Sequence, residues 1–298
     1  MVSAGTNELD ALCSALVNIV ENLGKKMDEY RDEPATGSIA ARELAALSDP
    51  TPLKTAFSQG VQRLVAAGDH CFALERVLRP SAQSHAPWSI ARGVLEASSV
   101  AKWLLDPSLD IDTRLSRSMS LRLSSLREQK KFAGEGLDGR PEMVKSFDQI
   151  SSHTDERIQH VVSQANQLGI PEKRDAKKRL LGFGEGLPNK INLAQQVFGD
   201  AWVYRILSGV AHGESWATLV LTMRRVGERN AVTQHLTPEA VRFLVIRCID
   251  WFAHAVWVYF ALNGWDMQKL ATSLEENYRL AHIDPRRRFW QISAGKQP

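Results

Sequence analysis

The amino-acid sequence predicts an all-α protein built as a helical bundle. Apolar residues recur at the helical period along nearly every segment of the 298-residue chain, and we find no convincing strand-type alternation of apolar and polar residues. Proline, glycine and asparagine separate these segments, as they commonly do between helices. The apolar fraction of 44% and the charged fraction of 24% are those of an ordinary soluble globular protein.

The first half of the chain contains five predicted helices. The earliest one carries leucines and an isoleucine along one side, which is the pattern of an amphipathic helix. Residues 31–49 are a weaker candidate, because Pro34 and Gly37 interrupt them. Pro52 suits the first turn of the helix that it begins. The five predicted helices cover residues 8–30, 52–78, 85–105, 112–132 and 141–168.

The second half opens with a basic stretch, residues 173–179, and a glycine-rich loop, residues 182–189. This loop lacks the G-x-x-x-x-G-K-[ST] pattern of a phosphate-binding loop, and no predicted strand precedes it. A helix that contains Arg205 and His212 follows, and the segment 219–235 remains ambiguous. The loop is therefore expected to connect helices rather than to bind phosphate.

A second strong helix signal begins at Thr237-Pro238-Glu239. Threonine is a good N-cap, proline suits the first helical position, and an acidic residue suits the first turn. This helix is predicted to reach residue 262, where Asn263-Gly264 breaks it, and a last helix is predicted to end near residue 282. We expect three regions: an N-terminal helix with a connecting segment (1–50), one helical-bundle domain (51–284) and a basic tail (285–298).

Composition narrows the function only broadly. A net charge of +3 permits an anionic partner without requiring one. The cysteines Cys13, Cys71 and Cys248 are far apart and odd in number, which favours a reducing compartment over a disulfide framework. The N-terminus lacks the pattern of a signal peptide, and the apolar stretch 248–262 is short for a membrane span. We expect a cytoplasmic protein with no membrane partner.

The spacing of Arg205 and His212 is the most informative pattern in the chain. Seven helical steps come to about 700°, about 20° short of two full turns, so both side chains lie on one face with Ser208 between them. An arginine is always charged, and a histidine titrates near neutrality. The pair therefore suits phosphoryl chemistry.

Three mostly apolar helices each carry one narrow line of polar residues. A helix that is apolar nearly all round should be buried, and a buried unpaired charge is very costly. We therefore expect at least two of the lines to face each other across a shared cleft. The alternative is that each line faces solvent or that its charges neutralise one another. The lines contain Arg92 with Glu96, Arg205 with Ser208 and His212, and Arg247 with Asp250 and His254.

Two of these helices resemble helices of the HEPN superfamily. The segment around Arg205 is similar to the R-x(4–6)-H helix of that superfamily; it reads Tyr204-Arg205-Ile206-Leu207-Ser208-Gly209-Val210-Ala211-His212-Gly213. The helix that contains Arg92 and Glu96 is similar to the R-x-x-x-E helix of some uncharacterised HEPN-like bacterial families. The resemblance covers roughly residues 52–262.

The resemblance implies a four-helix core, here with additional N- and C-terminal helices, that often forms a homodimer with two R…H pairs in one cleft. Many HEPN proteins are metal-independent RNA endonucleases of toxin–antitoxin or phage-defence systems, and others bind nucleotides or proteins without catalysis. By this resemblance, Arg205 would stabilise the scissile phosphate and His212 would move a proton at the ribose 2′-hydroxyl or the leaving oxygen. Ser208 would hold the phosphate or orient His212, with Tyr204, Arg92 and Glu96 in support.

The leading prediction is therefore metal-independent RNA cleavage without a cofactor, with RNA as the partner and an antitoxin or other protein as a further one. Ile206 follows the arginine where active members usually carry a polar residue, and Gly209 weakens the helix. A non-catalytic binding or regulatory module is the alternative. A third reading places a small-ligand pocket at Arg247, Asp250 and His254.

One metal-like pattern is discounted. His153, Glu156 and His160 share a helical face, as metal ligands would. The apolar residues of the same helix are centred about 220° away, so these three side chains are expected to face solvent.

Overall fold

The computed structural model describes residues 3–30, 33–79, 84–135, 141–221, 223–226, 231–234 and 236–280. Helices dominate these residues, which confirms the predicted all-α class. The predicted basic tail, residues 285–298, lies outside the described residues. The helices are α1 (Ser3–Glu29), α2 (Ile39–Ala46), α3 (Thr51–Leu78), α4 (Ala86–Leu105), α5 (Ile111–Glu135), α6 (Pro141–Gln167), α7 (Lys190–Phe198), α8 (Ala201–Ala211), α9 (Ser215–Leu221), α10 (Pro238–Asn263) and α11 (Met267–Leu280).

Two short hairpins correct the prediction that the chain has no strands. β1 (Glu172–Arg174) pairs antiparallel with β2 (Leu180–Phe183), and β3 (Met223–Val226) pairs antiparallel with β4 (Ala231–Gln234). Strands of three or four residues span too few positions for an alternating pattern to be recognised. The first hairpin, with its turn, contains the whole basic stretch and the start of the glycine-rich loop.

The chain folds into two compact units, a division that differs from the predicted ranges. The first unit comprises Met1–Ala45, Gly60–Pro107 and Lys190–Pro298, and the second comprises Ala46–Gln59 and Ser108–Asn189. The N-terminal helix α1 packs against α10 and α11 and is therefore part of the first unit's bundle.

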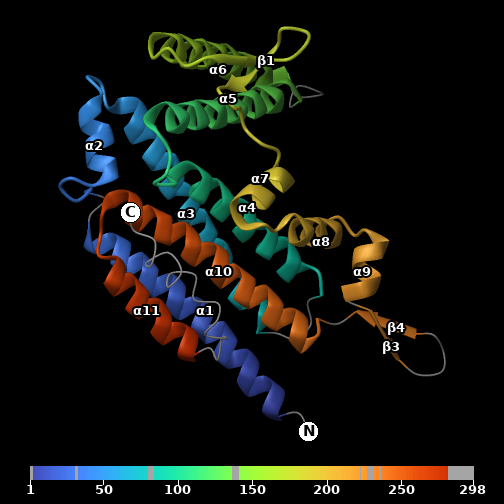
Figure 1. Cartoon of the computed structure of the whole chain (residues 1–298). Coiled ribbons are helices and arrows are strands. Elements are labelled where there is room, and N and C mark those ends of the chain that lie inside the picture. The colour runs from blue at the N-terminus through green and yellow to red at the C-terminus, as the bar shows by residue number, and fades with distance from the viewer. Residues whose placement is uncertain are drawn as a thin grey trace. The chain divides into compact units, whose positions relative to one another are not determined.

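Helix α10 is the central helix of the first unit (Figure 1). It packs against α4 and α1, while α7 and α8 pack on α4. The hydroxyl of Thr237 accepts a hydrogen bond from the Ala240 amide at 3.2 Å, and Gly264 ends the helix with a φ of 66°, so the predicted start and stop are confirmed. Within the described part of the chain, α10 is the one helix long and apolar enough to span a membrane, but 72% of its most apolar window is buried.

Glycines let α3 and α4 approach closely. A Cβ atom at Gly60 would lie 2.5 Å from the Leu105 side chain, and one at Gly93 would lie 2.8 Å from the His70 ring. Real Cβ contacts are longer than this. These two positions therefore fix the packing of α3 on the helix that carries Arg92.

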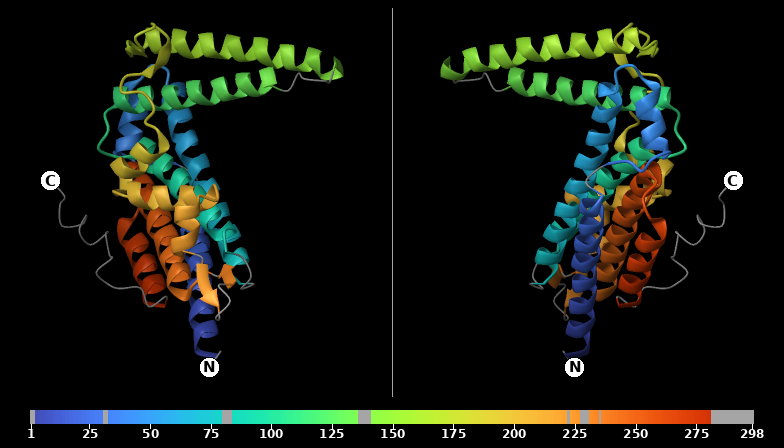
Figure 2. Two further views of the ribbon diagram at one scale, coloured as in Figure 1. Left: turned by 90° about the vertical axis from the view of Figure 1, so that its right-hand side faces the viewer. Right: turned by 90° about the vertical axis from the view of Figure 1, so that its left-hand side faces the viewer.

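The second unit consists mainly of the helix pair α5 and α6, which lie side by side in Figure 2, with the hairpin β1–β2 attached to α5. Ser120 of α5 accepts a hydrogen bond from the Phe183 amide at 2.8 Å. A Cβ atom at Gly184, which has a φ of 53°, would lie 2.7 Å from the Ser116 hydroxyl oxygen. The glycines of the loop thus serve the packing of its backbone on α5.

Candidate functional site

The helix that carries Arg205 ends one residue before His212. His212 occupies the C-cap of α8, and Gly213 follows in the left-handed region with a φ of 68°. The Gly213 amide donates to the Val210 carbonyl at 3.0 Å, and the Glu214 amide donates to the Gly209 carbonyl at 2.8 Å. This pair of bonds is a Schellman motif, which holds His212 at a fixed helix end.

Arg205, Ser208 and His212 line one open pocket of about 690 Å³. The predicted grouping of these three side chains is therefore found in the structure. Arg205 and His212 are both exposed. Arg205 makes no ion pair or hydrogen bond with any described residue, so its guanidinium is available to a ligand. The lining residues are Ile191, Tyr204, Arg205, Ser208, Gly209, His212, Glu214 and Trp216.

Arg92 of α4 connects the second predicted line to this pocket. Its Nε donates to Glu96 Oε1 at 2.7 Å, its Nη2 donates to the Tyr204 hydroxyl at 3.0 Å, and its Nη1 lies 3.2 Å from His212 Nε2. A guanidinium can only donate, so the Nε2 of His212 is the acceptor in this hydrogen bond. The polar faces of α4 and α8 meet, as expected for at least two of the three lines.

Glu96 balances the cations beneath the pocket. It accepts hydrogen bonds from Arg92, from Lys190 Nζ at 2.6 Å and from the Tyr204 hydroxyl at 3.2 Å. Burial raises the pKa of the Glu96 carboxyl, but the bonds from Lys190 and Arg92 outweigh burial and hold that pKa below its ordinary value. Glu96 is therefore a carboxylate near neutral pH, and it keeps the Arg92 guanidinium oriented.

The third predicted line, Arg247 with Asp250 and His254, does not converge on one ligand. Arg247 pairs with the carboxylate of Asp200, which also accepts a hydrogen bond from Trp251 Nε1 at 2.7 Å. The hydroxyl of Tyr278 donates to Asp250 at 2.7 Å. Each side chain of this line is thus engaged by a different part of the first unit.

His254 faces the amine of Lys102. The Nδ1 atom of His254 lies 3.5 Å from Lys102 Nζ, and that amine also donates to the Val197 carbonyl at 3.0 Å. Burial, with the nearby charges of Lys102 and Arg247, lowers the pKa of His254 to about 3. The half-buried ring is therefore neutral at physiological pH.

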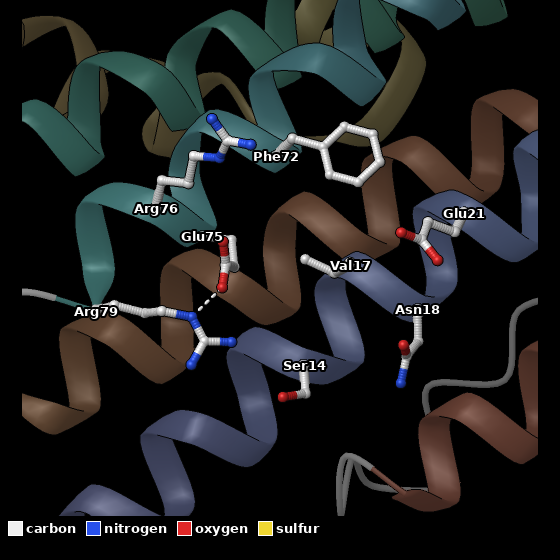
Figure 3. A pocket seen from close by; sticks show the side chains of 8 residues that line it. All are labelled: Ser14, Val17, Asn18, Glu21, Phe72, Glu75, Arg76 and Arg79. Atoms are coloured by element: carbon white, nitrogen blue, oxygen red, sulfur yellow. Dashed lines mark hydrogen bonds and ion pairs between the residues drawn. The ribbon is translucent and has the colours of Figure 1, made fainter.

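A second pocket, of about 350 Å³, lies between α1 and α3 (Figure 3). Arg79 pairs there with Glu75 and, at 3.2 Å, with Asp10. The residues that line this pocket include no histidine and no cysteine. It offers weaker means for acid–base chemistry than the pocket at His212.

The remaining histidines and the cysteines of the described residues form no group comparable to Arg205, Ser208 and His212. His153, Glu156 and His160 are exposed on α6, as predicted. Within the described ranges, no group of three His, Cys, Asp or Glu side chains is placed to hold a metal ion. All three cysteines are buried, and burial raises the pKa of Cys13 to about 11.

The sequence analysis missed four residues of the contacts described above. Lys190 and Ile191 belong to α7, a nine-residue helix that was not predicted, and Asp200 precedes α8 without capping it. Trp216 was also overlooked. Gly213 could have indicated that Trp216 lies near His212. A glycine directly after a helix implies a turn, and the segment after that turn begins close to the helix end.

No family model, curated protein sequence or solved structure matches this chain. The functional argument therefore rests on the geometry of the site.

Proposed function

We propose that the chain is an RNA endonuclease that cleaves without a metal ion, with Arg205 and His212 as its catalytic residues. The supporting observation is that Arg205, which makes no ion pair or hydrogen bond with any described residue, lines the same open pocket as His212, whose Nε2 accepts a hydrogen bond. This pair supplies a fixed positive charge for a phosphate and a group able to accept a proton.

In the proposed reaction, the ribose 2′-hydroxyl attacks the adjacent phosphorus while His212 Nε2 takes the hydroxyl proton. The bond from phosphorus to the 5′-oxygen breaks, and that oxygen leaves as a hydroxyl after it takes a proton from water, while the proton on His212 is released to the solvent. The products are a 2′,3′-cyclic phosphate and a free 5′-hydroxyl. Arg205 holds the charge that develops on the non-bridging oxygens.

Arg92 has a positioning role in this scheme. Its hydrogen bond orients the His212 ring in the free protein, and the substrate hydroxyl replaces it at Nε2 when RNA binds. Glu96 and Tyr204 hold the rest of the guanidinium in place, and Lys190 in turn donates to Glu96. Ser208, on the same face of α8, is placed to donate to the phosphate.

The test is incubation of the purified protein with total RNA in EDTA, with His212→Ala and Arg205→Ala as variants. His153→Ala is the matched control, because His153 is also exposed on a helix. We expect cleavage that leaves cyclic phosphates, a loss of roughly 10²-fold or more in His212→Ala, and no loss in the control. Intact RNA with a folded wild-type protein would contradict the proposal.

A second candidate is a binding module that does not cleave its ligand. It is favoured by the bond from Arg92, which already occupies the Nε2 lone pair of His212. In that case His212→Ala changes the affinity for RNA or a nucleotide, and no cyclic phosphate forms with any variant.

A further inference from the structure

Two tryptophans of the first unit are exposed to almost the same extent, 54% for Trp202 and 53% for Trp216. Trp202 has the ring of Phe243 as a neighbour, with 5.9 Å between the ring centroids. Trp216 lines the pocket of Arg205 and His212, whereas Trp202 does not. The two tryptophans are thus almost equally exposed, but only Trp216 lines the pocket.

The indole of Trp216 is held against the backbone of α8. A Cβ atom at Gly209 would lie 2.8 Å from Trp216 Cζ2 and 2.9 Å from the Ala217 Cβ, so only glycine leaves room for this contact. The Ala217 and Thr218 amides both donate to the Glu214 carbonyl, at 3.1 and 3.0 Å, and fix the start of α9. The ring is therefore a flat, supported surface rather than a loose side chain.

This surface lies close to Arg205, which has no ion-pair partner within the described ranges. Gly209 follows Arg205 by four residues, which is about 6 Å along the helix axis. A nucleotide joins a charged phosphate to a flat base, so it can place the phosphate on Arg205 and the base on Trp216. Bases stack on aromatic side chains only when they are not paired within a duplex.

Glu214 adds a preference for the kind of base. Its exposed side chain lines the same pocket, and a carboxylate can only accept hydrogen bonds. Cytosine presents an exocyclic amino group as a donor, whereas uracil presents a carbonyl at the same position. A carboxylate beside the stacked base therefore attracts the first and repels the second.

We infer that Trp216 and Glu214 form a nucleobase subsite that takes one unpaired base carrying an amino group, next to the phosphate on Arg205. This inference rests on the proposed function for its substrate, single-stranded RNA. Trp216 supplies stacking, Glu214 supplies discrimination, and Gly209 allows the ring to reach the pocket.

The experiment measures binding of fluorescein-labelled oligocytidine and oligouridine by anisotropy, with 2′-O-methyl riboses so that neither can be cleaved by 2′-hydroxyl attack. We expect Trp216→Ala to weaken oligocytidine binding by roughly 5- to 150-fold, the range for one stacked base. Trp216→Phe, which keeps an aromatic surface, should recover most of that loss. Trp202→Ala should bind like the wild type.

The preference for cytosine is tested with Glu214→Gln, whose amide both donates and accepts. The wild type should bind oligocytidine more tightly than oligouridine, and the variant should lose this difference. Equal binding of both oligonucleotides by the wild type, or unchanged binding by Trp216→Ala, would overturn the inference.

The same variants separate this inference from the proposed function. Cleavage of unmodified RNA by the wild type, together with unchanged binding by Trp216→Ala, would keep the nuclease and remove the subsite. Binding that depends on Trp216 in a protein that never cuts RNA would keep the subsite and remove the nuclease.

Discussion

The two polar lines that meet on α4 and α8 differ from the polar line of α10 in what their charges contact. At the pocket, Arg205 has no ion-pair or hydrogen-bond partner among the described residues, and His212 is exposed. On α10, Arg247 pairs with Asp200, and His254 is kept neutral beside Lys102. The same kind of sequence pattern thus produced an open pocket on α8 and a set of internal contacts on α10. The difference lies in the partners, which come from distant parts of the chain.

The largest expected change in stability that tests this comparison comes from replacing Asp200. It is only 3% exposed, and Asp200→Ala would leave the Arg247 guanidinium and the Trp251 indole N–H without their acceptor. Because the Arg247 side chain retains 23% exposure, we expect a loss of about 2–3 kcal/mol, at or below the lower end for a broken buried pair. Urea denaturation measures it. Glu214→Ala, an exposed acid at the pocket, is the control and should change stability by less than about 0.5 kcal/mol.

The next effect is a pH dependence caused by His254. The unfolded histidine binds a proton below about pH 6.5, whereas the folded ring stays neutral down to about pH 3. The unfolded state therefore binds more protons between these values, and stability falls as the pH is lowered from 7. The contribution is about 2 kcal/mol between pH 7 and pH 5.

His254→Gln isolates this contribution. The variant has no titrating group at this position, so its free energy of unfolding should fall less steeply over the same pH range. Parallel stability profiles for the wild type and His254→Gln would show that the ring is not kept neutral by burial, and the contrast between α10 and the pocket would fail.

The smallest effect concerns the glycine under Trp216. Alanine is the better helix former by about 1 kcal/mol, and Gly24→Ala should gain about that amount because nothing lies within 4 Å of the new Cβ. At Gly209 the same change pushes against Trp216 and Ala217, so we expect a net loss of about 1 kcal/mol. Thermal unfolding of the two variants measures the contrast, and a stabilised Gly209→Ala would show that the ring does not depend on this contact.

The sequence predicted the long helices well because their signals are local. The Thr237 cap and the apolar periodicity of α10 specify its start and its burial without any information from elsewhere in the chain. The pairing of Arg205 with His212 was also readable, since seven residues in a helix place two side chains on one face. The resemblance to the HEPN superfamily stays a prediction.

The features that the sequence did not predict depend mainly on contacts between residues far apart in the chain. Arg92 lies 120 residues before His212, and nothing in either helix states that the two side chains meet. Asp200 had the position of a helix cap but serves as the partner of Arg247 instead. The hairpins were missed because three or four residues carry too little periodicity to be recognised.

The Arg92 guanidinium also has a mechanical consequence. One rigid, planar group is fastened to its own helix through Glu96 and to α8 through both Tyr204 and His212. Sliding or rotating α8 along α4 would have to stretch the two links to α8 together, since the planar fork fixes their relative directions. The contact between the two helices is therefore rigid. The spacing between Arg92 and His212 is set by the packing of α4 on α8 rather than by a loop.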